Sequence, residues 1–148
     1  MKVTEAKLSN EYIRGLIEGE GCFTFCSVAF GGNKKLLPAF VLAMSSQDED
    51  LIKKVRDSLG LRNKVYSYKA RERKDGYKRQ GMAMFLVRDV GQIKNIIVPL
   101  FYKKLNGYKA KQFELWMERI KSDPLVPESY KFIYRIYKSG FYDKGKFE

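Results

Sequence analysis

Apolar residues along the first third of the chain change from a helical to an alternating spacing. Tyr12, Ile13, Leu16 and Ile17 recur every three to four residues after Ser9, a candidate N-cap, and predict a helix. Gly21 is expected to end this helix in the left-handed conformation. Strand-forming residues then dominate 22–30 and 39–44, which predict two strands joined by a turn at 31–33. Alternation places Phe23 and Phe25 toward a core, with Thr24 and Cys26 on the other face.

The same order recurs in the middle of the chain. Residues 46–60 carry a helical apolar stripe, with a capping box formed by Ser46 and Glu49, and Gly60 closes the segment. Residues 64–73 and 79–88 predict a hairpin around an Asp-Gly turn. A short helix is expected from Asp89 until Pro99 stops it. Amphipathic helices are predicted over 106–122 and 127–140, and residues 141–148 are expected to fray.

This order of elements predicts the fold class. Helix, two strands, helix, two strands and further helices indicate an α+β domain over residues 1–148, because no long crossovers connect parallel strands. The four strands are expected to form one antiparallel sheet, with helices covering one face. The opposite face remains available for a partner.

Composition narrows the nature of that partner. The net charge of +12 favours a polyanion, most often nucleic acid, although a merely basic protein is an alternative. Histidine is absent, which excludes mechanisms that need an imidazole. The two cysteines show no zinc-site spacing and are expected to be reduced thiols in an intracellular protein. No apolar run is long enough to span a bilayer.

Basic residues concentrate in the predicted second hairpin. Lys69, Arg71 and Arg73 share one strand face with Ser67, while Tyr66 and Tyr68 take the other. Lys78 and Arg79 follow on the returning strand. A two-stranded ribbon of this kind fits the major groove of DNA, where Arg and Lys contact guanine edges or phosphates. The alternative is a solvated, charged hairpin.

Residues 13–21, Ile-Arg-Gly-Leu-Ile-Glu-Gly-Glu-Gly, break a local rule. Two acids, Glu18 and Glu20, lie at a helix C-terminus, where the helix dipole disfavours negative charge. This stretch resembles the motif of the LAGLIDADG homing endonucleases. Gly15, Leu16, Ile17 and Gly21 are identical to that motif, and the two glutamates replace its aspartates. The order of elements also resembles the family's αββαββα core with additional C-terminal helices.

The resemblance implies a dimer. The motif occurs once, and family members with one motif pair with themselves around a two-fold axis. The expected interface on the motif helix consists of Ile13, Gly15, Leu16 and Gly19, because glycines four residues apart let a second backbone approach. Both acidic helix ends would then meet at the centre of a near-palindromic double-stranded DNA target.

The resemblance also implies metal-dependent hydrolysis of phosphodiester bonds. Glu20 would be the main ligand of Mg²⁺ or Mn²⁺, assisted by Glu18, either structurally or through its backbone carbonyl. Lys109 would act on the phosphate or the water network, with Lys104 as the second candidate. Met44 stands where the family often has a glutamine, and Gln47 follows one helical turn later. Thr24, Cys26 and the basic hairpin are the expected DNA contacts.

Two other functions stay open from the sequence. The same scaffold could bind nucleic acid without cutting it, as an intron RNA maturase or a DNA-binding regulator, which Met44 favours. The retained acids and Lys109 favour the endonuclease. In a third interpretation, residues 13–21 are a plain helix end in a basic globular protein.

Overall fold

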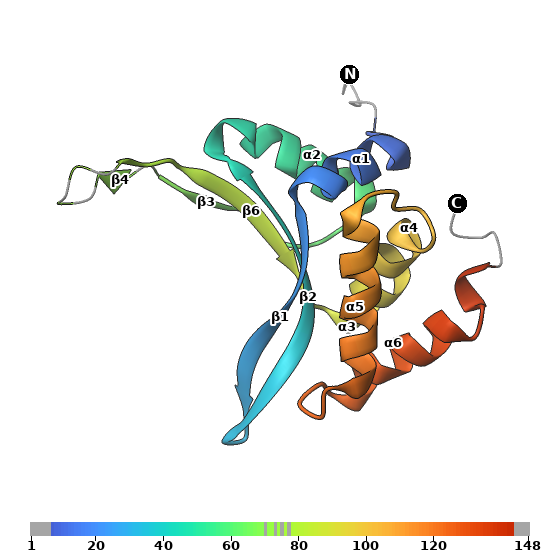
Figure 1. Cartoon of the computed structure of the whole chain (residues 1–148). Helices are drawn as coiled ribbons and strands as arrows, with labels where there is room; N and C mark the ends of the chain where they lie inside the picture. Colours follow the sequence, from blue (N-terminus) through green and yellow to red (C-terminus); the bar gives the residue numbers. More distant parts are fainter. Residues whose placement is uncertain (1–6, 70, 73, 75, 77, 144–148) are drawn as a thin grey trace.

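The structure is a computed structural model that describes residues 7–69, 71, 72, 74, 76 and 78–143. Helices and strands follow the predicted order (Figure 1). The first half contains α1 (Asn10–Glu20), β1 (Gly21–Phe30), β2 (Asn33–Ser45), the 3-10 turn η1 (Ser46–Asp48), α2 (Glu49–Leu59) and β3 (Tyr66–Tyr68). The second half contains β4 (Arg71–Glu72), β5 (Lys78–Arg79), β6 (Met82–Val87), α3 (Val90–Gln92), the π-turn η2 (Ile93–Ile97), α4 (Val98–Phe101), α5 (Tyr108–Ser122), α6 (Glu128–Lys138) and η3 (Phe141–Asp143).

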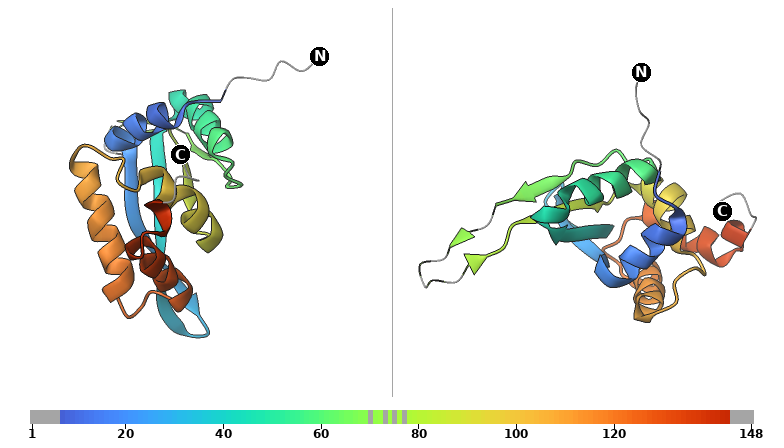
Figure 2. Two further views of the ribbon diagram at one scale, coloured as in Figure 1. Left: turned by 90° about the vertical axis from the view of Figure 1, so that its right-hand side faces the viewer. Right: turned by 90° about the horizontal axis from the view of Figure 1, so that it is seen from above.

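The main sheet is antiparallel and has the strand order β1-β2-β6-β3. Strands β4 and β5 pair separately and extend the second hairpin away from the body, as the view from above shows (Figure 2). The helices lie on one side of the sheet, and its other face is open (Figures 1 and 2). The predicted α+β fold is therefore confirmed.

Aromatic side chains fill the space between the sheet and the helices. Phe23 of β1 lies opposite Phe40 of β2, and its ring centroid is 5.2 Å from those of Phe113 and Trp116 on α5. Phe101 of α4 contacts Phe23 from the same side, at 5.3 Å. The predicted inward direction of Phe23 is thus confirmed, and Thr24, one residue later, faces the open side.

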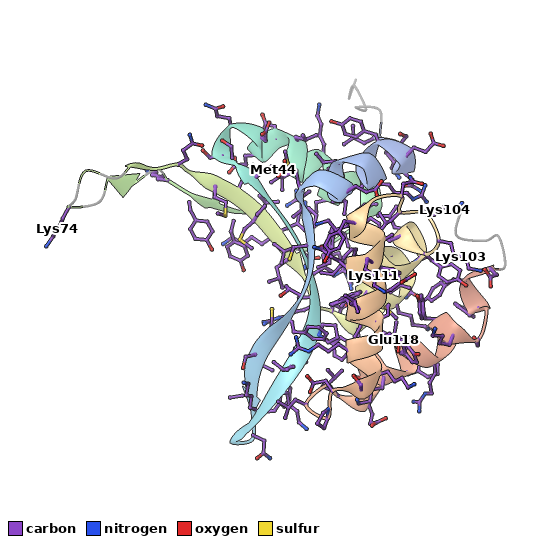
Figure 3. The ribbon with its side chains drawn as sticks, in the orientation of Figure 1. Met44, Lys74, Lys103, Lys104, Lys111 and Glu118 are labelled. Atoms are coloured by element: carbon purple, nitrogen blue, oxygen red, sulfur yellow. The ribbon has the colours of Figure 1, made fainter. Side chains whose placement is uncertain are left out.

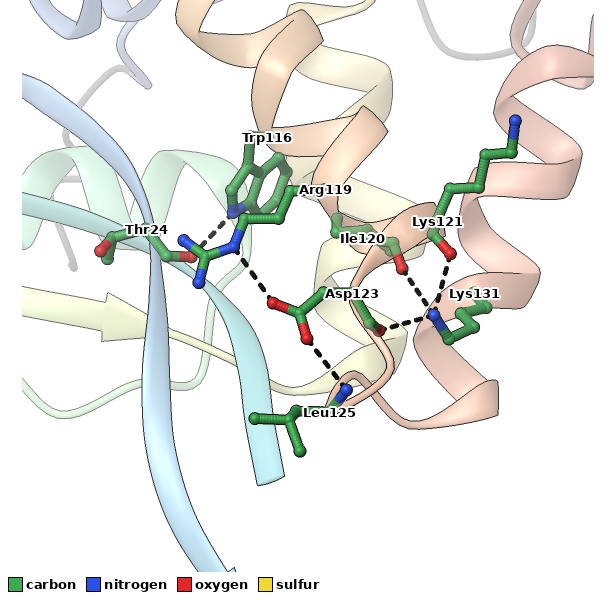
Figure 4. A network of polar contacts seen from close by, with 8 residues as sticks. All are labelled: Thr24, Trp116, Arg119, Ile120, Lys121, Asp123, Leu125 and Lys131. Carbon is green, nitrogen blue, oxygen red and sulfur yellow. Dashed lines mark hydrogen bonds and ion pairs between the residues drawn. The ribbon is translucent and has the colours of Figure 1, made fainter. Parts of the chain in front are cut away.

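Polar contacts hold α5 along the edge strand β1 (Figure 4). The indole nitrogen of Trp116 donates to the Thr24 carbonyl oxygen at 2.8 Å, so this buried donor is satisfied by the strand itself. The Arg119 guanidinium lies 4.4 Å from the Phe25 ring centroid. At the C-terminal end of α5, the Lys131 ammonium of α6 donates to the carbonyl oxygens of Ile120, Lys121 and Asp123. These contacts fix α5, and hence its first residues, relative to β1.

Two helix-end predictions are wrong. Gly21 is extended, with φ −80° and ψ 162°, because the chain passes directly from α1 into β1. Its lack of a side chain is needed for another reason, since a Cβ there would lie 2.4 Å from Cγ2 of Ile17. The Ser46–Glu49 capping box does not form either. Ser46 begins a 3-10 turn capped by Ser45, and the Glu49 carboxylate instead contacts Lys53.

Other boundaries differ from the prediction for reasons of packing. Pro99 does not stop its helix, because the preceding turn widens to a π-turn, in which the Val98 N–H bonds the carbonyl of Ile93, and α4 continues to Phe101. The predicted second hairpin is divided between β3, β4, β5 and β6. Residues Phe141–Asp143 do not fray, because Tyr142 is buried and donates to the carbonyl of Lys94. Residues 144–148 lie outside the described part of the chain.

Candidate active site and nucleic-acid interface

The Glu18 carboxylate is bound by the start of α5. Its Oε1 atom accepts hydrogen bonds from the backbone N–H groups of Asn106 at 2.7 Å and Gly107 at 2.5 Å. These two bonds hold the pKa of Glu18 below its ordinary value. The acid at the unfavourable end of α1 therefore serves as the cap that α5 lacks in its own sequence, at a helix N-terminus where negative charge is favoured. The sequence gives no signal for this contact, because its donors are backbone groups.

Lys109 lies beside the end of the motif. Its ammonium donates to the carbonyl oxygen of Gly21 at 2.5 Å, one residue after Glu20. Glu20 is exposed, and its carboxylate has no hydrogen bond or ion pair with the described residues. Lys109 therefore contacts the backbone of the residue that follows the motif's last acid.

Three other residues have no hydrogen bond or ion pair with Glu20 or Lys109 within the described part of the chain. Lys104 is exposed and lies near Lys103, on the side opposite the tip that carries Lys74 (Figure 3). Gln47 is exposed in η1, and no described contact joins it to Glu20 or Lys109. Met44 packs against the core on the helix-covered face, opposite Ala83.

The oxygen donors at this end of α1 fit a hard cation only in part. Glu20 offers a free carboxylate, whereas one Glu18 oxygen is occupied by backbone amides. No group of three or more His, Cys, Asp or Glu side chains gathers at a metal-binding distance within the described residues. A single chain thus supplies one free carboxylate, which can hold Mg²⁺ or Mn²⁺ together with water, phosphate oxygens or a second copy of the site.

The open sheet face differs from the predicted one. The register pairs Tyr66 with Met84 and Tyr68 with Met82, which places both tyrosines on the open face. Ser67 pairs with the inward residue Ala83 and hydrogen-bonds Glu49 of α2, so the predicted face of Ser67 is wrong. The prediction from the sequence assigned the face that carries the basic residues to the open side of the sheet. The pairing of β3 with β6 instead determines which residues face that side. Thr24 and Cys26 do lie on the open face.

Six neighbouring residues form what we call the apolar centre of this face. They are Val41 and Ala43 of β2, Met82, Met84 and Leu86 of β6, and Tyr66 of β3. Tyr66 is 46 % exposed and Met82 is 38 % exposed, and the others are partly exposed. The pairing register of β2, β6 and β3 brings these residues together on one face.

Basic residues lie around the apolar centre. Lys34 and Lys35 are near the tip of the first hairpin, and the ammonium of Lys64 is 5.3 Å from the Tyr66 ring centroid. Lys69 is exposed directly after β3, and Lys74 extends from the far tip (Figure 3). The backbones of Arg71, Lys78 and Arg79 belong to the β4–β5 ribbon, whereas Arg73 lies outside the described residues.

The residues predicted for a dimer interface on α1 differ in their burial within the single chain. A Cβ added at Gly15 or Gly19 would meet nothing within 4 Å, so both glycines leave open space within this chain. Leu16 is only partly buried against the core. Ile13 is fully buried inside the same chain, so its assignment to a dimer interface is wrong. The helical spacing of Ile13 was equally consistent with a position in the core of the chain.

The family model for LAGLIDADG endonuclease matches residues 13–120, which include the motif, the sheet and most of α5. The chain belongs to the LAGLIDADG endonuclease family. The match begins at the motif and covers the acids and Lys109 described above. No helix in the described part of the chain is both long and apolar enough to cross a membrane.

Solved structures of this family share the fold. The homing endonuclease I-GzeII in complex with its DNA target is 24 % identical over 93 % of this chain, with a TM-score of 0.59. The homing endonuclease I-LtrWI bound to target DNA is 23 % identical over 94 %, also at 0.59. The meganuclease I-CpaMI bound to uncleaved DNA is 21 % identical over 94 %, at 0.62. The chain spans 45 %, 46 % and 47 % of these proteins respectively, or about half their length.

Proposed function

We propose that the chain is a metal-dependent endonuclease that cuts a near-palindromic double-stranded DNA site as a homodimer. The main support is the end of α1, where the free carboxylate of Glu20 directly precedes a carbonyl held by Lys109. The open glycine face of the same helix supports pairing of two chains, and the half length relative to the DNA-bound structures agrees with it. A DNA duplex would lie along the open sheet face.

Each residue at the helix end has a distinct part in this proposal. Glu20 would hold Mg²⁺ or Mn²⁺, which supplies an activated water and neutralises charge on the phosphate. Glu18 is a positioning residue, since its bonds to residues 106 and 107 fix the start of α5 and therefore the Lys109 ammonium. Lys109 places a positive charge at the carbonyl of Gly21, the residue after Glu20, where it would stabilise a scissile phosphate oxygen.

The substitution Glu20→Gln tests the proposal. It keeps the size of the side chain but removes the free carboxylate at the helix end, so cleavage in Mg²⁺ should nearly vanish. DNA affinity in Ca²⁺ should stay at the wild-type level. Glu11→Gln is the matched control, because it removes an exposed acid from the first turn of the same helix. The target site comes first from selection of cleaved duplexes out of a random library. A Glu20→Gln variant that cuts at the wild-type rate would disprove the assignment.

A non-cleaving nucleic-acid-binding protein is the second candidate function. Two observations favour it: Met44 packs against the core on the helix-covered face, and one oxygen of Glu18 is hydrogen-bonded to backbone amides. Such a protein would select a duplex, or an intron RNA, without cutting it in Mg²⁺ or Mn²⁺. The same library, scored once for bound and once for cleaved molecules, distinguishes the two functions.

A further inference from the structure

The side chains of the apolar centre differ from those that usually distinguish one DNA base from another. Guanine is recognised in the major groove by Arg or Lys, and adenine by bidentate hydrogen bonds with the side-chain amide of Asn or Gln. The centre contains none of these side chains, because its members are Val41, Ala43, Met82, Met84, Leu86 and Tyr66. Apart from the hydroxyl of Tyr66, these side chains offer only methyl, methylene, thioether and ring carbon groups, which form no strong hydrogen bonds with the polar edges of the bases. They can contact the C5-methyl group of thymine.

The arrangement of charge favours one partner for this surface. An apolar patch of this kind could bind a protein, but cations lie on the same sheet. Lys35 is on the same side of β2 as Val41, six residues before it, and the Lys64 ammonium lies over the Tyr66 ring. Phosphates border the major groove on both sides, and basic groups around an apolar centre complement that pattern. Duplex DNA therefore fits the whole face, whereas an uncharged protein surface would match only its centre.

We infer that the apolar centre selects thymine methyl groups, so each half-site carries A·T pairs where it faces this part of the sheet. The inference rests on the proposed function, because it assumes that duplex DNA lies on the open face. Across the register, Met84 lies between Ala43 and Tyr66, so a base opposite it would meet apolar groups on three strands. Tyr68, which is 53 % exposed and pairs with Met82, extends the surface at the same edge.

Replacing thymine with deoxyuridine tests the inference without changing the protein. Uracil lacks the C5-methyl group but keeps every hydrogen-bonding atom of thymine. Binding is measured in Ca²⁺ on the duplex selected from the random library, with single thymines replaced in turn. Removal of each methyl group that the protein touches should weaken binding about fourfold. Deoxyuridine in the flanking sequence is the control and should leave affinity unchanged.

A protein variant assigns the effect to the apolar centre. Met84→Ala should bind the unmodified site more weakly and should lose its sensitivity to deoxyuridine at one position. Leu115→Ala, on the helix side and equally apolar, should keep the full sensitivity. Tight binding that deoxyuridine leaves unchanged throughout the site, or a selected site that is G·C-rich at these positions, would overturn the inference and leave the proposed function intact.

Failure to bind any duplex would instead overturn the proposed function, and the inference with it. If the open face is covered by a second copy of the chain, Met84→Ala should change the sedimentation of the DNA-free protein. That result, combined with no deoxyuridine effect, would also overturn the inference.

Discussion

Single residues at the end of α1 show how one acid can be explained without a metal. The resemblance implied that Glu20 is the main metal ligand and that Glu18 assists it, either structurally or through its backbone carbonyl. The structure separates the two acids by their contacts, because the Glu18 carboxylate is bound by backbone N–H groups and that of Glu20 is not. That division depends on residues 106 and 107, which are nearly ninety positions away in the chain.

Glu18→Gln should therefore weaken the fold in a pH-dependent way. The pKa of Glu18 is lower in the folded chain, because two backbone N–H groups bind its carboxylate, so the carboxylate stabilises the fold above the pKa that Glu18 has in the unfolded chain. The contribution is lost as the pH falls through the lowered folded value. At pH 7, denaturant titration should show about 1 kcal/mol less stability for the variant, after allowance for solvent screening. The difference should disappear in acid. Glu114→Gln, an exposed acid on α5, should show no such difference.

Gly21 makes a second prediction at this scale. A Cβ at this position would lie 2.4 Å from Ile17 Cγ2 and 3.0 Å from its carbonyl oxygen, and Ile17 is fully buried. Gly21→Ala should lower the free energy of unfolding by about 1–3 kcal/mol. Gly15→Ala is the matched comparison, because its Cβ meets nothing and alanine favours a helix by roughly 0.5–1 kcal/mol. Urea titrations at two protein concentrations separate this effect from dimerisation. Equal stability of wild type and Gly21→Ala would show that the contact relaxes at no cost.

At the scale of elements, periodicity predicted the helices and strands, but not their junctions. The apolar spacing found α1, β1, α5 and α6 because each buries one face of an amphipathic segment. The prediction that Pro99 stops its helix was wrong, because the preceding residues form a π-turn and the chain continues from it into α4. The face of Ser67 was also unpredictable, since charge suggested one side and the pairing of Tyr66 with Met84 required the other. Such choices depend on contacts between elements distant in the chain.

The helix α1 carries the prediction of pairing. Gly19 is exposed and has open space around it, so Gly19→Leu should fold normally as a single chain. The leucine side chain would separate two copies of the helix, and sedimentation should show a monomer with weak DNA binding. Ser129→Leu, which adds the same side chain to an exposed position of α6, should leave the dimer intact. Wild-type protein that is monomeric on its DNA target would contradict the proposed homodimer.

At the scale of the whole molecule, the net charge of +12 does not say which surface meets DNA, so composition alone could not locate the interface. The fold divides these charges into two groups. Lys69 directly follows β3 in the chain. Lys74 lies at the tip of the second hairpin, while Lys111 lies on α5, on the helix side of the sheet (Figure 3). The proposed function assigns the group on the hairpin to DNA binding. The proposed function therefore requires that only part of the positive charge contributes to binding.

Salt dependence measures that part directly. Neutralising a phosphate releases counterions, so the logarithm of the binding constant should fall against the logarithm of salt concentration by about 0.9 per phosphate neutralised. The double variant Lys69→Ala with Lys74→Ala should reduce this slope by about 0.9 for every phosphate that these lysines neutralise. It should weaken binding to all sequences alike, because phosphate contacts carry no base information. The double variant Lys111→Ala with Lys121→Ala removes the same charge from the helix side and should leave the slope unchanged. Equal slopes for the two double variants would mean that the whole positive field, rather than the open face, determines binding.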